Sequence, residues 1–272
     1  METIRKSVAS LPVAPHMVDY VRTCAEFSWS QVRSELAGLP GGAGLNLAYE
    51  AVDRHVAEGR GAATALRWFA KDSTIREFTY EDLSRATNRL ANVLKSLPLA
   101  KGERVFSLLG RVPDLYFTAL GTLKNAAVFC PLFSQFGPEP IWQRLHRGDA
   151  RVLVTTVASY EKKLAPLLDR LPQLAYVLLI DAADDLSNRV LSLPKRFAAA
   201  SEAFEIPPTS ADDFALLHFT SGTTGMPKGA VHVHEAVLTH YATGKFVLDF
   251  HPGDVFWCTA DPGWVTGTSY GI

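Results

Sequence analysis

The residues with the clearest chemical potential lie in one short stretch, 219–229, which reads Phe-Thr-Ser-Gly-Thr-Thr-Gly-Met-Pro-Lys-Gly. It packs three glycines, four hydroxyl side chains and one lysine into eleven residues. Glycines let the main chain approach a ligand closely, and successive free N–H groups form an anion-binding concavity. Hydroxyl groups add donors, Lys228 adds a charge suited to phosphate, and Pro227 restricts the backbone. The stretch predicts a polyphosphate cradle made by Thr220, Ser221, Gly222, Thr223, Thr224, Gly225, Lys228 and Gly229.

Two other interpretations of this stretch have to be considered. A hairpin loop rich in Ser, Thr and Gly can be solvated and bind nothing. The fixed order of glycine, hydroxyl, proline and lysine argues against that reading. A Walker P-loop has Gly, four residues, then Gly-Lys-Ser/Thr. Its spacing does not fit, because Lys228 follows Pro227 and precedes Gly229.

The elements around this stretch must hold it in place. The apolar run 214–219 and the run 230–233 read as strands, so the loop lies between two strands. Before them, short apolar runs alternate with amphipathic helices, which predicts a parallel sheet covered on both faces. The loop would then follow the carboxyl end of a strand, where open α/β sheets bind ligands.

Further elements follow from periodicity and turn residues. Residues 63–69 and 74–78 predict a hairpin. Thr79 is expected to cap the next helix, with Asp82 as the acid of a weak capping box. The remaining expected strands are 105–109, 127–132, 152–155, 176–180 and 255–258, and the remaining expected helices are 45–56, 113–124, 138–147, 159–171 and 235–250.

The chain is expected to be an α/β protein with layered parallel sheets flanked by helices. Four parts are predicted: an N-terminal arm (1–44), a first α/β lobe (45–180), a charged and proline-bearing connection (181–211) and the start of a second α/β lobe (212–272). The second lobe carries the glycine-rich loop.

Composition limits the classes of partner. With 27 basic and 28 acidic residues the formal net charge is −1, so neither nucleic acid nor a membrane is an expected partner.

Three cysteines without close pairing suit a reducing compartment. The N-terminus also lacks the apolar run of a secretory signal, so the cytoplasm is the expected location. His232 and His234 alternate along an expected strand and point to opposite faces, so no metal site is expected.

The order of residues in the loop resembles the phosphate loop of adenylate-forming enzymes, the superfamily of acyl-CoA synthetases, luciferases and peptide-synthetase adenylation domains. The resemblance extends to Phe-Thr-Tyr-Glu-Asp-Leu at 78–83 and Lys-Gly-Glu-Arg-Val at 101–105. Two more segments, 45–55 and 260–267 (Ala-Asp-Pro-Gly-Trp-Val-Thr-Gly), are similar to the acetyl-CoA synthetase branch. The likeness covers the chain from about 29 to 272.

This resemblance implies a two-step ligase reaction. A carboxylate attacks the α-phosphorus of ATP, which arrives with Mg²⁺, to give an acyl-adenylate and pyrophosphate, and the CoA thiol then displaces AMP. Acetate or another short-chain acid is the implied substrate, with Lys228 as the implied catalytic residue. The resemblance assigns an acyl pocket to Trp264, Val265 and Thr266, and contacts with CoA to Thr266 and Arg144. The alternatives are a Trp264 that only covers the core and a solvated helix-face Arg144.

In the family, much of the remaining machinery lies beyond the length seen here. The chain is therefore expected to be an N-terminal portion of such an enzyme, inactive alone. The alternative hypothesis is a non-catalytic nucleotide-binding or interaction module that retained the loop.

Overall fold

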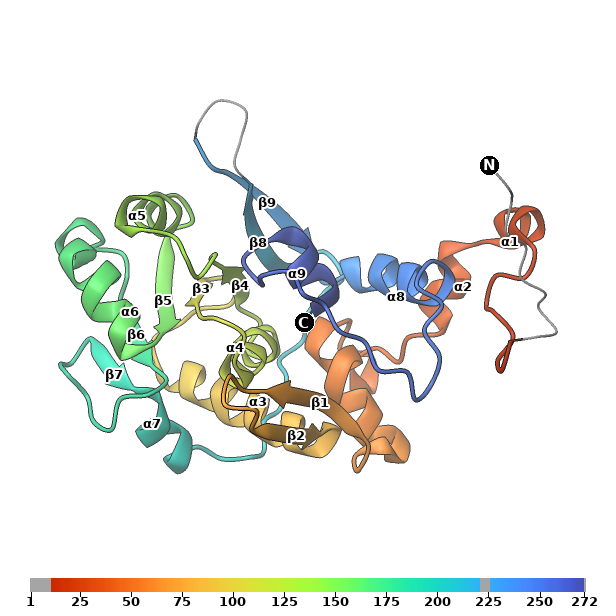
Figure 1. Cartoon of the computed structure of the whole chain (residues 1–272), viewed down its shortest axis with the longest axis horizontal. Helices are drawn as coiled ribbons and strands as arrows, with labels where there is room; N and C mark the ends of the chain where they lie inside the picture. Colours follow the sequence, from red (N-terminus) through yellow and green to blue (C-terminus); the bar gives the residue numbers. More distant parts are fainter. Residues whose placement is uncertain (1–10, 221–225, 272) are drawn as a thin grey trace. The chain divides into compact units, whose positions relative to one another are not determined.

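Residues 11–220 and 226–271 are described by the structure, a computed structural model. The chain forms two compact units, a smaller one from Met1–Ala37 and Ala236–Trp257 and a larger one from Gly38–Glu235 and Cys258–Ile272. The larger unit contains the sheets, shown in Figure 1.

The larger unit is built on a seven-stranded sheet in the order β7-β6-β5-β3-β4-β8-β9. Neighbouring strands are parallel except for the pair β8 and β9, which is antiparallel. The strands are β3 (Arg104–Leu108), β4 (Val128–Pro131), β5 (Ala150–Thr155), β6 (Tyr176–Leu179), β7 (Val190–Ser192), β8 (Phe214–Thr220) and β9 (Lys228–Val233). This arrangement confirms the predicted α/β class with a parallel sheet.

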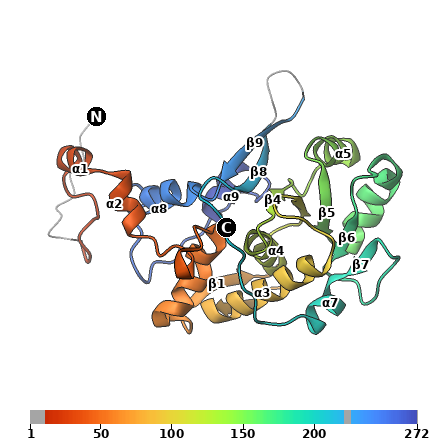
Figure 2. The same ribbon diagram turned by 180° about the vertical axis from the view of Figure 1, so that it is seen from behind.

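Helices cover both faces of this sheet, and successive residues of one strand enter opposite cores. In β3, Val105 packs into the core beneath helices α3 (Tyr80–Ser96) and α4 (Pro113–Lys124). The next residue, Phe106, packs into the core beneath α5 (Pro138–Arg147). Figures 1 and 2 show these helices on either side of the strands. The remaining helical segments of this unit are η2 (Pro40–Gly42), η3 (Tyr49–Asp53), η4 (Val56–Arg60), α6 (Val157–Ser159), η5 (Tyr160–Leu164), η6 (Ala165–Arg170), α7 (Leu193–Ala199) and α9 (Val265–Gly271).

A two-stranded hairpin of β1 (Thr64–Phe69) and β2 (Ile75–Thr79) leads into α3, as predicted. The predicted capping box is present. The Thr79 hydroxyl accepts from the Asp82 N–H at 3.1 Å, and the Asp82 carboxylate accepts from the Thr79 N–H at 2.9 Å. Two of the unpaired donors at the start of α3 are thereby satisfied.

The smaller unit consists of α1 (Tyr20–Glu26), α2 (Trp29–Ser34) and α8 (Ala236–Phe246) with their connections. Its polar centre is Glu35, which accepts from the Tyr241 hydroxyl at 2.8 Å and pairs with the Lys245 ammonium at 2.7 Å. These contacts hold α8 against the end of α2, since both partners of Glu35 lie on α8.

The structure differs from the sequence-based expectations in three segments. The prediction of a strand at 255–258 is wrong: these residues form no strand, and Val255 and Trp257 are 83% and 82% exposed. Strand propensity alone does not make a strand without a partner. The expected arm 1–44 contains α1, α2 and η2, and the expected connection 181–211 contains β7 and α7. β4 of the expected first lobe pairs with β8 of the expected second lobe in one sheet. The division into two lobes stays a prediction.

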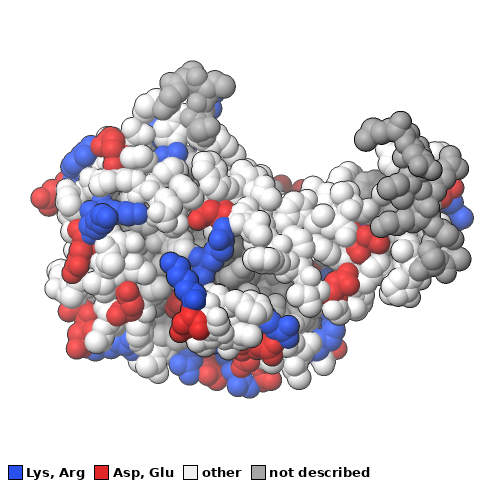
Figure 3. Space-filling view, in the orientation of Figure 1, with Lys and Arg blue, Asp and Glu red and all other residues white. Residues whose placement is uncertain are grey.

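Charged residues of both signs are interspersed on the face of the larger unit that Figure 3 shows. Among the residues described here, every helix is too short or too polar to cross a lipid bilayer.

Candidate functional site

The two ends of the glycine-rich loop are held together by the hairpin of β8 and β9. Thr220, the last residue of β8, lies opposite Lys228, the first residue of β9. The Thr220 hydroxyl donates to the Lys228 carbonyl at 3.4 Å, and both residues are exposed. The predicted cradle residues Ser221, Gly222, Thr223, Thr224 and Gly225 lie outside the described residues.

Gly229, the last predicted cradle residue, has a packing reason in the structure. A Cβ atom at this position would lie 2.8 Å from Cδ1 of Leu217 on the neighbouring strand. Glycine lets β9 lie close against this buried leucine, so the residue shapes the hairpin that carries Lys228.

The strand that leads into the glycine-rich stretch ends at the carboxyl edge of the parallel sheet. β8 runs parallel to β4, with Phe129 opposite Leu216. Carboxyl ends of parallel strands meet at one edge, so Thr220 and the residues after Pro131 lie along the same edge. Open α/β sheets bind ligands there, in agreement with the position expected from the sequence.

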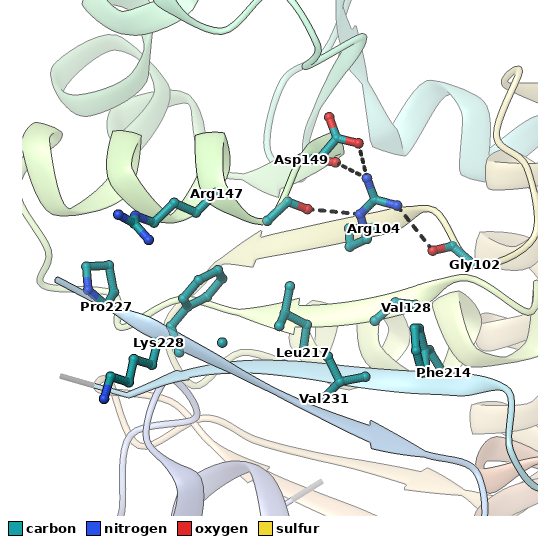
Figure 4. A pocket seen from close by; sticks show the side chains of 13 residues that line it. Gly102, Arg104, Val128, Arg147, Asp149, Phe214, Leu217, Pro227, Lys228 and Val231 are labelled. Atoms are coloured by element: carbon teal, nitrogen blue, oxygen red, sulfur yellow. Dashed lines mark hydrogen bonds and ion pairs between the residues drawn. The ribbon is translucent and has the colours of Figure 1, made fainter. Parts of the chain in front are cut away.

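A groove of about 570 Å³ adjoins the hairpin on the α5 side of the sheet. Figure 4 shows Arg147 and Lys228 at one end of it, beside Pro227. Its third cation, Arg104, pairs with the Asp149 carboxylate and also donates to the Gly148 carbonyl. Within residues 11–220 and 226–271, neither Arg147 nor Lys228 forms an ion pair. This end of the groove therefore presents two positive charges to an anion.

A second loop, 258–264, packs on the same edge of the sheet. Arg111, which follows β3, donates to the carbonyls of Thr259 and Ala260. Ser134, which follows β4, donates to the Asp261 carboxylate at 3.1 Å. That carboxylate also accepts from the Gly263 N–H at 2.8 Å. These bonds fix the loop over the carboxyl ends of β3 and β4.

The loop presents the aromatic residue that the resemblance assigned to the acyl pocket. Trp264 is 47% exposed, and its ring packs at 44° against Phe133 with a centroid distance of 5.2 Å. Val265 is 51% exposed at the start of α9. Thr266 is exposed, and its carbonyl accepts from the Cys258 thiol at 3.7 Å. Trp264 is thus about half exposed, whereas a tryptophan that only filled the core would be buried.

Arg144 lies in a different environment from the one expected for a phosphate-binding arginine. It is 9% exposed, its guanidinium stacks 4.2 Å from the Phe136 ring, and it donates to the Pro140 carbonyl at 2.9 Å. Burial lowers the pKa of its guanidinium. Its assignment to CoA stays a prediction, and the exposed cation of α5 is Arg147.

Several residues of this site are not evident from the sequence. Arg111 and Ser134 act through contacts with a loop far along the chain, and no local pattern indicates such pairs. Arg147 has a visible signal, since it lies three residues after Arg144 on the same helix. The structure distinguishes the two arginines, because Arg144 is buried against the Phe136 ring whereas Arg147 is exposed.

Comparison with known proteins gives concordant results. A family model described as AMP-binding enzyme matches residues 53–272. The acetyl-coenzyme A synthetase of Bacillus subtilis (strain 168) is 38% identical over 269 residues, which are 98% of this chain and 46% of that protein. The acetyl-coenzyme A synthetase of Bdellovibrio bacteriovorus is 33% identical over 244 residues, 84% of this chain and 38% of that protein.

A solved structure of an acyl-CoA synthetase from Brucella canis shares the fold, with a TM-score of 0.82 and 32% identity over 92% of this chain and 44% of that chain. This chain thus spans less than half the length of these relatives. The family match covers most of the chain and includes the hairpin and the loop described above, and we conclude that the chain belongs to the AMP-binding enzyme family.

Proposed function

We propose that this chain carries the ATP phosphate loop and the acyl-binding loop of an ATP-dependent ligase. The ligase joins acetate, or another short-chain carboxylate, to CoA by way of an acyl-adenylate. Its substrates are the acid, ATP with its Mg²⁺, and CoA, and a cytoplasmic location is part of the proposal. The chain by itself is not expected to complete the reaction.

The observation that carries the proposal is the position of Thr220 and Lys228, the residues on either side of the predicted cradle. They pair with each other at the carboxyl edge of the sheet. The loop 258–264 is fixed along the same edge by Ser134 and Arg111. A nucleotide held by the cradle would have an acid held by this loop within one site.

The chemistry asked of these residues is positioning and charge stabilisation. Attack on the α-phosphorus needs an in-line arrangement of the carboxylate and the leaving pyrophosphate. Pyrophosphate gains negative charge in the transition state, and donors aimed at that charge lower the barrier. Lys228 and the loop hydroxyl groups suit this role because they supply positive charge and hydrogen-bond donors, and none of them has to act as a nucleophile.

The preference for a short acid rests on Trp264. Its ring stands against Phe133 at the end of β4, so two aromatic rings form a wall beside the loop. We infer that this wall limits the length of the alkyl chain that the site accepts. These two residues support a short acid as the substrate. Similarity to acetyl-coenzyme A synthetases also supports it.

A chimera provides the test. This chain replaces the segment aligned with it in the Bacillus subtilis relative, which supplies the rest of a full-length protein. Acetate-dependent exchange of pyrophosphate into ATP, followed by acetyl-CoA formation, is the expected result. Binding of ATP without exchange, in a folded chimera, would instead support the nucleotide-binding module. The unmodified relative serves as the positive control.

A further inference from the structure

Three potential metal ligands lie together in the smaller unit, which contains none of the residues assigned to the ligase. His16 precedes α1, while Asp249 and His251 follow α8, and all three belong to the same compact unit. One ligand atom from each lies within 4.8 Å of the others. His16 is exposed, and the other two residues are half-buried, so solvent and ions have access to the cluster.

The cluster is already organised by contacts between its members. The His16 N–H donates to the Asp249 carboxylate at 2.8 Å, and His251 Nε2 lies 3.3 Å from the same carboxylate oxygen. The two imidazole rings stack at 10° with centroids 4.2 Å apart. His16 Nε2 lies 3.0 Å from the Phe250 carbonyl. Segments 233 residues apart in sequence are thus joined at this point.

This set of donors suits a divalent transition-metal ion. Imidazole nitrogen and carboxylate oxygen are ligands for zinc, and three protein ligands with water in the fourth position form a common open site. Tetrahedral zinc with Zn–N bonds of about 2.0–2.1 Å needs ligand atoms about 3.4 Å apart. The two rings are stacked in the absence of an ion, so one ring has to turn out of the stack before both nitrogens can bind the same ion, and the exposure of His16 permits this turn.

We propose that His16, Asp249 and His251 bind a divalent transition-metal ion, Zn²⁺ by preference, which ties the segment before α1 to the segment after α8. The ion is separate from the Mg²⁺ that accompanies ATP, since hard Mg²⁺ prefers oxygen ligands and keeps its waters. Its role is to stabilise the smaller unit. Because the site uses other residues than the ligase site, its test is independent of the proposed function.

Zn²⁺ titration calorimetry and the absorption spectrum of bound Co²⁺ test the proposal on the full chain, free of any histidine tag. The variants are His16→Ala, His251→Ala and Asp249→Asn, with His146→Ala as a control histidine that stacks on Trp142 outside the cluster. The wild type and the control are expected to bind one ion tightly with a tetrahedral Co²⁺ spectrum. Each cluster variant is expected to bind Zn²⁺ at least about tenfold more weakly. Replacing a residue that only hydrogen-bonds to a metal ligand already lowers metal affinity by about that factor.

Thermal unfolding with and without Zn²⁺ separates metal binding from the existing contacts. Asp249→Asn keeps an oxygen that accepts from the His16 N–H, so its melting temperature without metal should match the wild type. Zn²⁺ should raise the melting temperature of the wild type and of His146→Ala but not that of Asp249→Asn. Equal Zn²⁺ affinity and an equal thermal shift in wild type and all three cluster variants would overturn the proposal, as would an absence of Zn²⁺ binding by the wild type.

Discussion

Trp264 is the residue on which the proposed choice of acyl chain depends. Replacing it with glycine (Trp264→Gly) in the chimera should open space beside Phe133 and shift preference from acetate toward butyrate. One methylene in such a pocket is worth about 1–3 kcal/mol, so the ratio of turnover for the two acids should change roughly ten- to two-hundredfold. The measurement is kcat/KM for each acid.

Trp264→Phe is the matched control, because it keeps an aromatic ring against Phe133 and should shift the ratio much less. Half-exposure of the indole predicts only a modest fall in melting temperature for the glycine variant. An unchanged acid ratio with a large fall in melting temperature would identify Trp264 as a structural residue and remove the residue-level support for a short-chain substrate.

His234 gives the fold a dependence on pH. Its ring is fully buried, and Nδ1 accepts from the Leu47 N–H at 3.1 Å, which ties the end of β9 to the start of the helical segment containing η3. Burial is the main cause that lowers its pKa from 6.5 to about 4. The Lys101 charge lowers the pKa further, and the Asp213 carboxylate opposes both effects. The neutral ring is therefore the native form.

Because the unfolded chain binds a proton at this histidine near pH 6.5 and the folded chain only near pH 4, stability is complete above pH 6.5 and falls between the two values. A shift of one pKa unit corresponds to about 1.4 kcal/mol. The free energy of unfolding should therefore be lower by about 2 kcal/mol at pH 5 and by about 3 kcal/mol at pH 4 than at neutral pH. Urea unfolding at pH 7 and pH 5 measures it. His234→Asn keeps an acceptor for Leu47 but does not titrate, so it should lack this component. Equal pH sensitivity in the variant and the wild type would refute the assignment.

At the scale of elements, the loop 258–264 depends on a close backbone approach. A Cβ atom on Gly263 would lie 2.2 Å from the Phe133 backbone nitrogen, far inside van der Waals contact. Gly263→Ala must therefore displace the loop from the end of β4. We expect acid-dependent pyrophosphate exchange in the chimera to fall by an order of magnitude or more, because small misplacements of reacting groups cost about 10²-fold.

Gly110→Ala provides the comparison, since an added Cβ there meets nothing within 4 Å. It should leave exchange near the wild-type rate. If Gly263→Ala retained the same rate as Gly110→Ala, the packing of this loop on Phe133 would have no part in holding the acid.

The elements that the sequence predicts well are those that local signals specify. Thr79 and Asp82 mark the start of α3 because both partners of the capping box lie within one turn. The strands of the parallel sheet follow from short, continuously apolar runs. The segment 255–258 has the same kind of apolar composition but no partner strand. Whether a strand finds a partner depends on the rest of the fold, so the composition of one segment does not predict it.

Site residues follow the same division. Lys228 and its neighbours are predictable because their order is local. Arg144 and Arg147 look equivalent in sequence, and their difference depends on where the Phe136 ring lies. The support of the loop 258–264 by Arg111 and Ser134 depends on long-range packing, which residue order does not specify.

At the scale of the whole molecule, the chain is one part of a larger functional arrangement in its relatives, since it spans less than half of their length. The larger unit supplies a sheet edge with two loops and a groove with two available cations. The smaller unit carries the proposed metal site and contributes none of the residues assigned to the ligase. Activity and metal binding are therefore expected to respond to separate sets of substitutions.

The most direct test of the central claim is the rate of acetate-dependent pyrophosphate exchange in the chimera carrying Lys228→Ala, at saturating ATP. Lys162→Ala, an exposed lysine on η5, is the matched control. Loss of one donor to a developing charge typically costs about 10²–10³ in rate, so Lys228→Ala should be slowed by that order while Lys162→Ala exchanges like the parent chimera. An unchanged rate for Lys228→Ala would contradict the assignment of this hairpin to the pyrophosphate of ATP.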